Sequence, residues 1–526
     1  MLKKLDRETI ISELEKENGP SLLANNPHID KNSLLDDTAA LFIEQGIGSA
    51  LLVRLVKTRS LLIRLSSEPE ILPAVRRYLD AESPKLRRNA ARLLGQLSRS
   101  EDDAELLASR LITEPQRYVR PSIILSLGLI GGETAQKTLD AYSPIPPADE
   151  TEIKHYDEEC EALRLARVTA MRHEKHTFRG LDKPYDIELS APDRLSEQLK
   201  EELEELGFSV LDVRRSSVNV KTDDYSALFE ARCFSEALFT IAKGISLKPE
   251  TVAPIAKSFI LDFMRTTHAG DPPYRYRIEI DGDIVDIDGN FERTTYKRAV
   301  RDLIDDDRIV NAPSDYEIEL RIVPAGNASR LYLKLFTVKD ERFFYRKQTI
   351  AASMNPSTAA AVLRLASDYL TLNARVIDPC CGSGTLLFER GLIAPCASLT
   401  GVDIAHAAID AARINADAAY LHGITHAKFI CNDILRFESK RPYDELICNL
   451  PFGNRVGNHS SCARLYTGLL DRLPLLVKKG GVAVLYTMEF TLLKNLIRTH
   501  SNLEILKTER TEAGGLTPMV FVIRVN

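Results

Sequence analysis

Residues 375–385 read RVIDPCCGSGT, and this stretch decides the fold of the C-terminal part of the chain. Its first three residues form a short apolar run that predicts a buried strand, and Asp378 stands at the carboxyl end of that run. Two glycines, Gly382 and Gly384, follow with one residue between them, and a helical pattern begins at Thr385. In a doubly wound sheet, ligands bind at such a strand-to-helix turn, where glycines let the backbone approach the ligand closely. The stretch therefore predicts a ligand site at the carboxyl edge of a parallel sheet.

The residues of this turn favour a cationic ligand. The dinucleotide fingerprint needs a third small residue for close helix packing, but the chain has Leu387 at that position. Asp378 would repel a diphosphate, whereas it would attract the ammonium or sulfonium group of S-adenosyl-L-methionine. The turn therefore indicates S-adenosyl-L-methionine, rather than a pyrophosphate cofactor, as the ligand.

Two further strands are predicted to end in aspartate. Residues 399–402 are apolar and lead to Asp403, which is placed to accept hydrogen bonds from ribose hydroxyls. Residues 429–432 lead to Asp433, which would bind the adenine amino group while Ile434 packs on the adenine ring. A single aspartate at such a position is often only a helix cap. Three in succession at strand ends favour a cofactor site.

The loop Asn449-Leu450-Pro451-Phe452 follows the apolar strand at residues 445–448 and suits methyl transfer to an aromatic amine. Such an amine is a weak nucleophile because its lone pair is delocalised into the ring. The Asn449 side-chain oxygen and the Leu450 carbonyl, aimed at the two amine hydrogens, would free that lone pair. Pro451 stiffens the loop, and Phe452 offers a face on which the base can stack. In-line positioning and matched dipoles then suffice without a strong base; the plainer alternative is a proline turn with a buried phenylalanine.

These motifs resemble those of class I S-adenosylmethionine-dependent methyltransferases, specifically the THUMP-domain RNA guanine-N2 methyltransferases that modify tRNA. The resemblance covers residues 355–526, about a third of the chain. It rests on the D-P-x-C-G-S-G-T turn, the N-L-P-F-G loop, and residues 355–361, which look like the helix before the family's first strand. Residues 455–457, after the catalytic loop, also fit. Leu450 stands where many amino-methyltransferases carry proline, but the mechanism uses only its carbonyl.

The motifs and the resemblance together assign two sets of site residues. The catalytic set comprises Asn449, Leu450, Pro451 and Phe452. The cofactor-binding set comprises Thr358, Asp378, Pro379, Cys380, Gly382, Gly384, Thr385, Asp403, Ile404, Asn432, Asp433, Ile434 and Asn449. No metal site is expected, because the eight cysteines contain no C-x-x-C and the histidine pairs lack partners at ligand spacing.

The predicted fold class is multidomain α and α/β. The resemblance implies a C-terminal, doubly wound, Rossmann-like methyltransferase domain at residues 351–526. Its seven-stranded sheet would have an antiparallel hairpin at one edge, and residues 503–525, broken by Gly514 and Gly515, fit that hairpin.

The central part shows short strands separated by helical stretches. Strands at 185–189, 209–213 and 217–220, with helices at 194–205 and 224–231, predict a ferredoxin-like subdomain over residues 183–262. The following α+β pattern, residues 263–350, looks like the THUMP domain, which in that family grips the acceptor end of tRNA. Basic residues here are predicted to contact phosphates, the alternative being a solvated strand face. They are Arg330, Lys334, Arg342, Arg346 and Lys347.

Residues 1–142 are helical and contain an internal echo. Residues 86–97 align with residues 119–130 at an offset of 33 residues, which predicts stacked helical hairpins of HEAT type. This domain would bind a protein partner, extend an RNA surface, or serve a purely structural role. The arginines available for an RNA surface are Arg87, Arg88, Arg92, Arg117 and Arg120. A Pro- and acid-rich stretch then begins a predicted linker, residues 143–182.

The composition suits a multidomain cytoplasmic enzyme of 526 residues without membrane association. No apolar run is long enough to span a bilayer, and the N-terminus is acidic and amphipathic rather than a signal peptide. The net charge of −6 is unusual for an RNA-binding protein, but residues 355–526 carry 18 basic against 15 acidic side chains. Binding to RNA would therefore depend on local basic patches. The sequence does not set the oligomeric state.

Three functions stay open from the sequence. The first is guanine-N2 methylation of a tRNA guanosine that is flipped from a stem into the pocket. The second is the same chemistry on ribosomal RNA. The third is a non-catalytic scaffold that binds RNA or protein.

Overall fold

The computed structural model describes residues 7–15, 29–147, 149–170, 175–283, 292–326, 328–351, 353–452, 459–512 and 515–526. The chain forms two compact units. The first comprises residues 1–175 with 310–316, and the second comprises residues 176–309 with 317–526. Within the described ranges, no helix is both long and apolar enough to cross a membrane.

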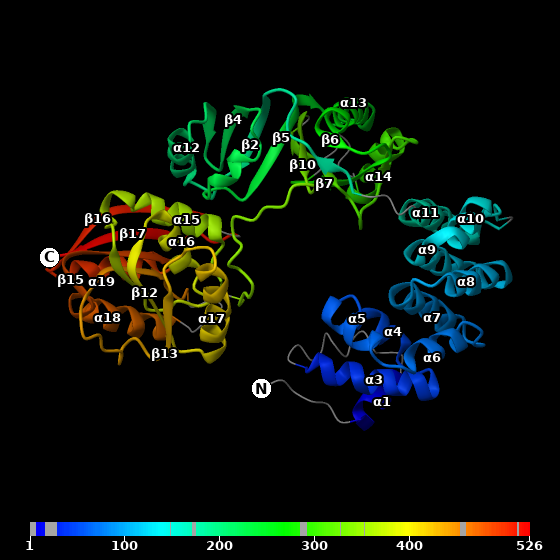
Figure 1. Cartoon of the computed structure of the whole chain (residues 1–526), viewed down its shortest axis with the longest axis horizontal. Coiled ribbons are helices and arrows are strands. Elements are labelled where there is room, and N and C mark those ends of the chain that lie inside the picture. The colour runs from blue at the N-terminus through cyan, green and yellow to red at the C-terminus, as the bar shows by residue number, and fades with distance from the viewer. Residues whose placement is uncertain are drawn as a thin grey trace. The chain divides into compact units, whose positions relative to one another are not determined.

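The first unit is built from helices, which Figure 1 shows in blue and cyan. They are α1 (Arg7–Glu15), α3 (Lys31–Gln45), α4 (Ser49–Leu55), α5 (Arg59–Ser66), α6 (Ile71–Tyr78), α7 (Pro84–Leu97), α8 (Glu101–Thr113), α9 (Arg120–Ile130), α10 (Gly132–Ala141) and α11 (Ile153–Ala170). Helices α7 and α9 pack together, as do α9 and α11. A Cβ on Gly95 of α7 would lie 2.8 Å from Ser126 of α9, and one on Gly128 of α9 would lie 2.7 Å from Ala166 of α11. The 33-residue echo therefore repeats a glycine that lets one helix approach the next.

Helix α11 lies inside the segment predicted as a linker. Its residues Ala162, Leu163 and Ala166 are buried in the core of the first unit. The Pro- and acid-rich composition ends before this amphipathic helix begins, so it gave no indication of the packing that follows. The helical stack therefore continues through residues 153–170.

The arginines considered for an RNA surface have partners inside the first unit. The buried Arg87 guanidinium donates to Glu114 Oε1 and Oε2 at 2.7 and 2.9 Å, and Arg120 donates to the Glu114 carbonyl at 3.1 Å. Arg92 donates to Ser122 Oγ at 3.0 Å. The other two contact the Ile145 carbonyl (Arg117, 2.7 Å) and the Tyr118 ring (Arg88, 5.6 Å to the centroid). These contacts favour the structural role over an RNA surface.

An eight-stranded sheet forms the central part of the second unit, in the order β3-β4-β2-β5-β10-β9-β7-β8. Its strands are β2 (Tyr185–Ser190), β3 (Val210–Arg214), β4 (Ser217–Thr222), β5 (Glu236–Ser246), β7 (Tyr274–Ile280), β8 (Ile309–Asn311), β9 (Ile318–Ala325) and β10 (Ala328–Leu335). The accompanying elements are α12 (Ser196–Glu205), α13 (Pro249–Thr267), α14 (Arg293–Ile304), and the strand pair β1 (Thr177–Phe178) and β6 (His268–Ala269). Strand β5, which was not predicted, pairs with β2 and with β10. The two predicted subdomains therefore share one sheet. A short 3-10 helix at Ala227–Glu230 replaces the helix predicted at 224–231.

Three of the five predicted phosphate contacts are engaged within the central part. Arg342 is buried and donates to the carbonyls of Ala231 and Phe234 at 3.1 and 2.9 Å. Its Nε and Nη2 donate to Asp340 at 2.9 and 2.7 Å, so its prediction as a phosphate contact is wrong, because partners within the protein take up its donors. Lys334 donates to Glu236 at 2.5 Å, and Arg330 lies 3.9 Å from Glu188.

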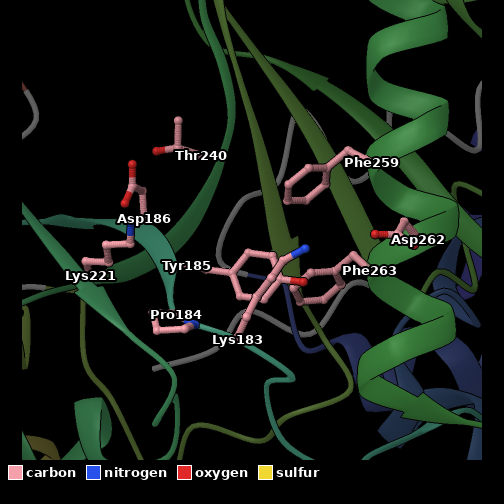
Figure 2. A pocket seen from close by; sticks show the side chains of 9 residues that line it. All are labelled: Lys183, Pro184, Tyr185, Asp186, Lys221, Thr240, Phe259, Asp262 and Phe263. Carbon is pink, nitrogen blue, oxygen red and sulfur yellow. The ribbon is translucent and has the colours of Figure 1, made fainter.

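A cavity of about 270 Å³ opens where β2 and β5 separate (Figure 2). In Figure 2 the rings of Tyr185 and Phe263 lie close together, with their centroids 5.2 Å apart. Lys183 Nζ lies 5.4 Å from the Tyr185 centroid. The cavity is lined by two lysines, two aspartates and apolar rings, so its charges balance. None of the lining residues belongs to the predicted site.

The C-terminal part of the second unit is a seven-stranded sheet in the order β13-β12-β11-β14-β15-β17-β16 (Figure 1). Its strands are β11 (Ala374–Asp378), β12 (Cys396–Asp403), β13 (Ala427–Cys431), β14 (Tyr443–Asn449), β15 (Val477–Thr487), β16 (Leu503–Arg510) and β17 (Met519–Val525). The first five run parallel, and β17 is antiparallel to both β15 and β16. The predicted doubly wound sheet with an antiparallel hairpin is confirmed.

Helices cover both faces of this sheet. Residues of α15 (Pro356–Leu365), α16 (Thr385–Ile393) and α17 (His406–Tyr420) share one core with one set of strand residues. Residues of α18 (His459–Leu476) and α19 (Phe490–Arg498) share a second core with the alternate strand residues. This alternation is what a parallel sheet buried on both faces requires.

A fully buried ion pair joins α16 to β14. Arg390 donates to Glu445 Oε2 and Oε1 at 2.7 and 3.0 Å, and neither side chain reaches solvent. Arg390 also donates to the Thr371 carbonyl at 2.7 Å, and Glu445 Oε1 accepts the Thr371 N–H at 2.6 Å. Because every charged atom here has a partner, the pair fixes α16, the helix that follows the glycine turn, against the middle of the sheet.

Replacing Arg390 with methionine should cost about 3–5 kcal/mol of unfolding free energy, because it leaves the Glu445 carboxylate buried without its partner. The double replacement Arg390→Met with Glu445→Gln should recover part of that loss. Chemical denaturation followed by circular dichroism measures both, since the chain has no tryptophan. A single replacement costing under about 1 kcal/mol, as at an exposed ion pair, would contradict this account of α16.

Candidate active site

Three strand ends meet at one edge of the C-terminal sheet. Asp378 is the last residue of β11, Asp403 the last of β12, and Asn449 the last of β14. Strand β11 lies between β12 and β14, and all three run parallel. Parallel strands place their carboxyl ends at the same edge, which is where ligands bind in such sheets. The glycine turn and the loop that starts at residue 449 are therefore neighbours.

The glycine turn is tied back to the sheet by its own backbone. The Gly382 N–H donates to Asp403 Oδ2 at 2.9 Å, and the Cys381 N–H donates to the Val402 carbonyl at 3.0 Å. Gly382 and Gly384 have φ angles of +53° and +86°, a left-handed conformation that favours glycine. Pro379 is buried in the turn, Cys380 is half-buried, and Thr385 begins α16. The G-x-G spacing is thus required by the path of the backbone.

Asp378 is a buried carboxyl beside the turn. It accepts the Cys380 N–H at 3.1 Å on Oδ1. Burial, with a further contribution from the nearby Asp403, raises the pKa of Asp378 to about 8. At neutral pH the carboxyl is therefore mainly protonated, and a cation placed beside it would favour the ionised form. This is consistent with the cationic ligand predicted from the sequence.

Asp403 and Asp433 accept hydrogen bonds from backbone N–H groups, and their carboxylates can still accept further ones. Asp403 Oδ1 accepts the Ala405 N–H at 2.9 Å in addition to the Gly382 bond, and Asp433 Oδ1 accepts the Leu435 N–H at 2.9 Å. Each carboxylate oxygen has a second lone pair that can accept a ligand hydroxyl or amine. Both side chains are half-buried.

The two isoleucines of the predicted set face different surroundings. Ile434 is 3% exposed and packs in the core beneath α18, so its predicted contact with an adenine ring is wrong. Ile404, directly after Asp403, is 73% exposed at the sheet edge. The sequence pattern did not give the direction of either side chain. Asn432 is exposed beside them, and its N–H donates to the Asp403 carbonyl at 3.0 Å.

The loop after β14 presents one unpaired acceptor. Asn449 Oδ1 is buried and has no hydrogen-bond partner within the described residues. A buried polar atom without a partner is costly, and such an atom at a strand end indicates a place for a ligand. The Leu450 side chain is buried in the core, and its N–H donates to the Tyr486 carbonyl at 2.9 Å. Leu450 therefore contributes only its backbone to the edge.

Residues that the motifs did not include hold this loop. Tyr466 of α18 donates its hydroxyl to the Pro451 carbonyl at 2.8 Å, and Cys462 Sγ lies 3.3 Å from the same oxygen. The Phe452 ring is tilted against Tyr486 with centroids 5.9 Å apart. Tyr486 lies near the carboxyl end of β15, and since ligands bind at strand ends in such sheets, its place near the site could have been predicted from the sequence. No spacing in the sequence indicates Tyr466. Gly453 and the predicted residues 455–457 lie outside the described residues.

The helix before β11 starts close to the glycine turn. Asn355 caps α15 by accepting the Ser357 N–H at 2.9 Å, and Thr358 lies half-buried in the first turn of that helix. Just before it, Ser353 Oγ lies 2.8 Å from Ser383 Oγ in the turn. The edge thus combines a cradle of backbone, three aspartate carboxyl groups and an amide oxygen without a partner among the described residues, which suits a cationic ligand such as S-adenosyl-L-methionine.

Two protein-family models match parts of this chain. Residues 344–518 match the family of RMKL-like methyltransferase domains, and residues 53–141 match HEAT repeats. The C-terminal region is a methyltransferase domain. This match agrees with the S-adenosyl-L-methionine cofactor predicted from the sequence. The match to HEAT repeats agrees with the predicted helical hairpins of the first unit.

Curated relatives are distant and only partly covered. A tRNA (guanine(10)-N2)-dimethyltransferase of Methanothermobacter thermautotrophicus is 27% identical over 158 residues, which are 30% of this chain and 43% of that protein. A tRNA (guanine(6)-N2)-methyltransferase of Methanocaldococcus jannaschii is 24% identical over 217 residues, 34% of this chain and 56% of that protein. A ribosomal RNA large subunit methyltransferase G of Alteromonas mediterranea is 29% identical over 129 residues, 23% of this chain and 30% of that protein. The chain thus spans roughly a third to a half of the length of these relatives.

Among solved structures, a putative methyltransferase complexed with SAH has a similar fold. It has a TM-score of 0.51 and 15% identity, and the similarity covers 66% of this chain and 99% of that one. At this identity the likeness concerns the fold alone.

Binding of S-adenosylmethionine at pH 7 should release up to about one proton, because the cation ionises an Asp378 carboxyl that is about 90% protonated when its pKa is near 8. Calorimetric titrations in buffers of different ionisation enthalpy measure that release. Asp378→Asn should abolish the dependence on buffer. A wild-type binding enthalpy that is the same in all buffers would contradict the predicted role of this carboxyl.

Replacing Tyr466 with phenylalanine should slow methyl transfer roughly tenfold, the effect of losing one hydrogen bond that positions the Pro451 carbonyl and its loop. The affinity for S-adenosylhomocysteine should not change, since the Tyr466 hydroxyl bonds to the Pro451 carbonyl and to Thr487 and, among the described residues, to none of the glycine turn. Tyr420→Phe, on the exposed face of α17, is the matched control. Equal rates in the two variants would exclude the positioning role of Tyr466.

Proposed function

We propose that this protein transfers a methyl group from S-adenosyl-L-methionine to the exocyclic N2 amine of a guanosine in tRNA. The proposal rests on Asn449 Oδ1, which is buried at the sheet edge beside the glycine turn and has no hydrogen-bond partner among the residues that the structure describes. The distant relatives named as tRNA guanine-N2 methyltransferases support the choice of base and of RNA.

The chain's own residues would activate the amine by accepting its hydrogens. Asn449 Oδ1 would accept a hydrogen bond from one N–H of the amine, and the Leu450 carbonyl would accept one from the other. These two bonds would draw the nitrogen toward a tetrahedral shape and direct its lone pair toward the methyl donor. The cofactor would supply the methyl group and leave as S-adenosylhomocysteine, and one N2 proton would pass to solvent. Since these oxygens are fixed before the substrate arrives, the transfer gains from positioning and preorganised dipoles rather than from a strong base.

The base would be held by the aromatic side of the loop. Phe452 is half-buried and lies next to Tyr486, and we propose that the base stacks on its ring. A guanine in a helical stem must leave the stack to reach this edge, as in other enzymes that modify a base. Tyr466, through the Pro451 carbonyl, keeps the loop in place for it.

In this proposal the remaining parts serve recognition. Residues 351–526 form the catalytic domain, and residues 183–262 and 263–350 form the ferredoxin-like and THUMP-like RNA-binding part. The helical domain, which extends beyond residue 142 through α11, can recruit a protein. Of the predicted phosphate contacts, Lys347 keeps an exposed side chain, and Arg346 precedes it. With a net charge of −6, such local contacts must carry the affinity for RNA.

Ribosomal RNA is the second candidate substrate. The relative from Alteromonas mediterranea, whose name places it on large-subunit ribosomal RNA, supports this alternative. The site chemistry is the same for both RNAs.

Incubation of the full chain with labelled S-adenosylmethionine and separate tRNA and ribosomal RNA pools, followed by mass spectrometry of nucleosides, tests the substrate. N2-methylguanosine in the tRNA pool is the expected product. Labelled methylguanosine found only in the ribosomal RNA pool would show that the substrate is ribosomal RNA, the second candidate. Cofactor binding without methylation of either RNA would favour the non-catalytic scaffold.

Asn449→Ala should lower the transfer rate by about 100-fold or more, because one of the two preorganised acceptors is lost. Its affinity for S-adenosylhomocysteine should stay within about threefold of wild type, whereas Asp403→Ala should weaken that affinity by about tenfold through the loss of charge-assisted hydrogen bonds. Asn495→Ala, on the exposed side of α19, controls for the substitution itself. Undiminished transfer in Asn449→Ala would remove the proposed mechanism.

A further inference from the structure

The segment between β10 and α15 connects the central part of the second unit to the glycine turn. Its described residues 344–351 with 353–354 are here called the connecting segment. They make contacts at both ends, mainly with residues outside the set predicted from sequence.

The first end of the connecting segment is fixed on helix α16. The Tyr345 hydroxyl donates to Glu389 Oε1, and Tyr345 is fully buried. Arg232, which lies between η3 (Ala227–Glu230) and β5, donates to both oxygens of Glu389 at 2.8 and 2.9 Å. The Tyr345 ring also packs on Phe388, with centroids 5.0 Å apart. Glu389 therefore joins the central part, the connecting segment and α16 in one buried cluster.

The second end is fixed by a single buried amide, Asn415 of α17. Its Oδ1 accepts the Gln348 N–H at 2.8 Å, and its Nδ2 donates to the Gln348 carbonyl at 2.8 Å. The same Nδ2 donates to the Ser383 carbonyl at 3.0 Å. Ser383 lies between the two glycines of the turn, and Asn415 is 1% exposed. One side chain thus binds the connecting segment and the glycine turn together.

Two further contacts bring the connecting segment onto the turn. Ser353 Oγ lies 2.8 Å from Ser383 Oγ and accepts the Ile350 N–H at 3.0 Å. A Cβ on Gly382 would lie 3.6 Å from Ile350 Cδ1, so the isoleucine side chain covers that glycine. Asp403, at the end of β12, therefore binds the glycine turn on one side, and the connecting segment binds it on the other.

We propose that Asn415 and Ser353 are positioning residues for the cofactor: they hold the Ser383 peptide and hydroxyl so that the glycine turn keeps its cofactor-binding shape. The inference rests on the use of S-adenosylmethionine by this domain and not on the identity of the RNA. Neither residue touches the reacting atoms. Their loss acts on cofactor affinity through the turn.

The test uses the full chain with S-adenosylhomocysteine as the probe, and measures Kd by calorimetry and melting temperature by circular dichroism. Asn415→Ala should raise Kd about tenfold, the effect of removing a buried hydrogen-bond partner from the turn. Ser353→Ala should raise it by about threefold to tenfold, and Ser353→Thr, which keeps the hydroxyl, should restore it. The control is Asn89→Ala, which removes a buried amide in α7 that donates to Ser49 Oγ at 3.0 Å; it should lower the melting temperature without changing Kd.

A kinetic measurement separates positioning from stability. In methyl transfer, Asn415→Ala should raise KM for S-adenosylmethionine while kcat stays within about threefold, because the acceptors at residues 449 and 450 are untouched. Wild-type Kd in both Asn415→Ala and Ser353→Ala, with only a lower melting temperature, would overturn the inference. If Asn415→Ala does not fold, the Kd values of Ser353→Ala and Ser353→Thr test the inference without it. Wild-type protein that binds no S-adenosylhomocysteine would overturn the cofactor assignment itself, a result distinct from failure of the positioning role.

Discussion

The parallel register of β12, β11 and β14 is the constraint on which the rest of the site depends. It brings Asp403, Asp378 and Asn449, which lie far apart in the chain, to one edge of the sheet. Without that register the glycine turn and the NLPF loop would be two unrelated surface features. With it, a carboxyl suited to a cation and an amide oxygen suited to an amine stand on adjacent strands.

Buried charge keeps this edge in shape. Glu389 and Arg390 are consecutive residues of α16 and face different partners: Glu389 binds Arg232 and Tyr345, and Arg390 binds Glu445 of β14. Since removal of one partner leaves a charge without compensation, each pair resists displacement of the helix. The glycine turn enters this helix directly, so its position is set by the sheet on one side and by the central part on the other. Asn415 adds a third restraint at the turn itself.

The sequence predicted those features that depend on local pattern. The strand ends at Asp378 and Asp403 and the stacked helices of the 33-residue echo follow from periodicity and spacing, and the structure has them in the expected elements. Features that depend on distant partners were missed. Arg342 is buried between Asp340 and two carbonyls more than 100 residues upstream, and Ile434 turns into the core while Ile404 faces outward. Tyr466 and Asn415 belong to helices whose packing, and not their spacing, brings them to the loop and the turn.

A crystal structure of the full chain with S-adenosylhomocysteine would locate the ligand relative to the three strand ends. We expect the ligand at the carboxyl edge, with its amino group beside Asp378, its ribose at Asp403 and its sulfur facing Asn449. A ligand bound on another part of the domain, or one whose sulfur faces away from Asn449, would contradict this expectation.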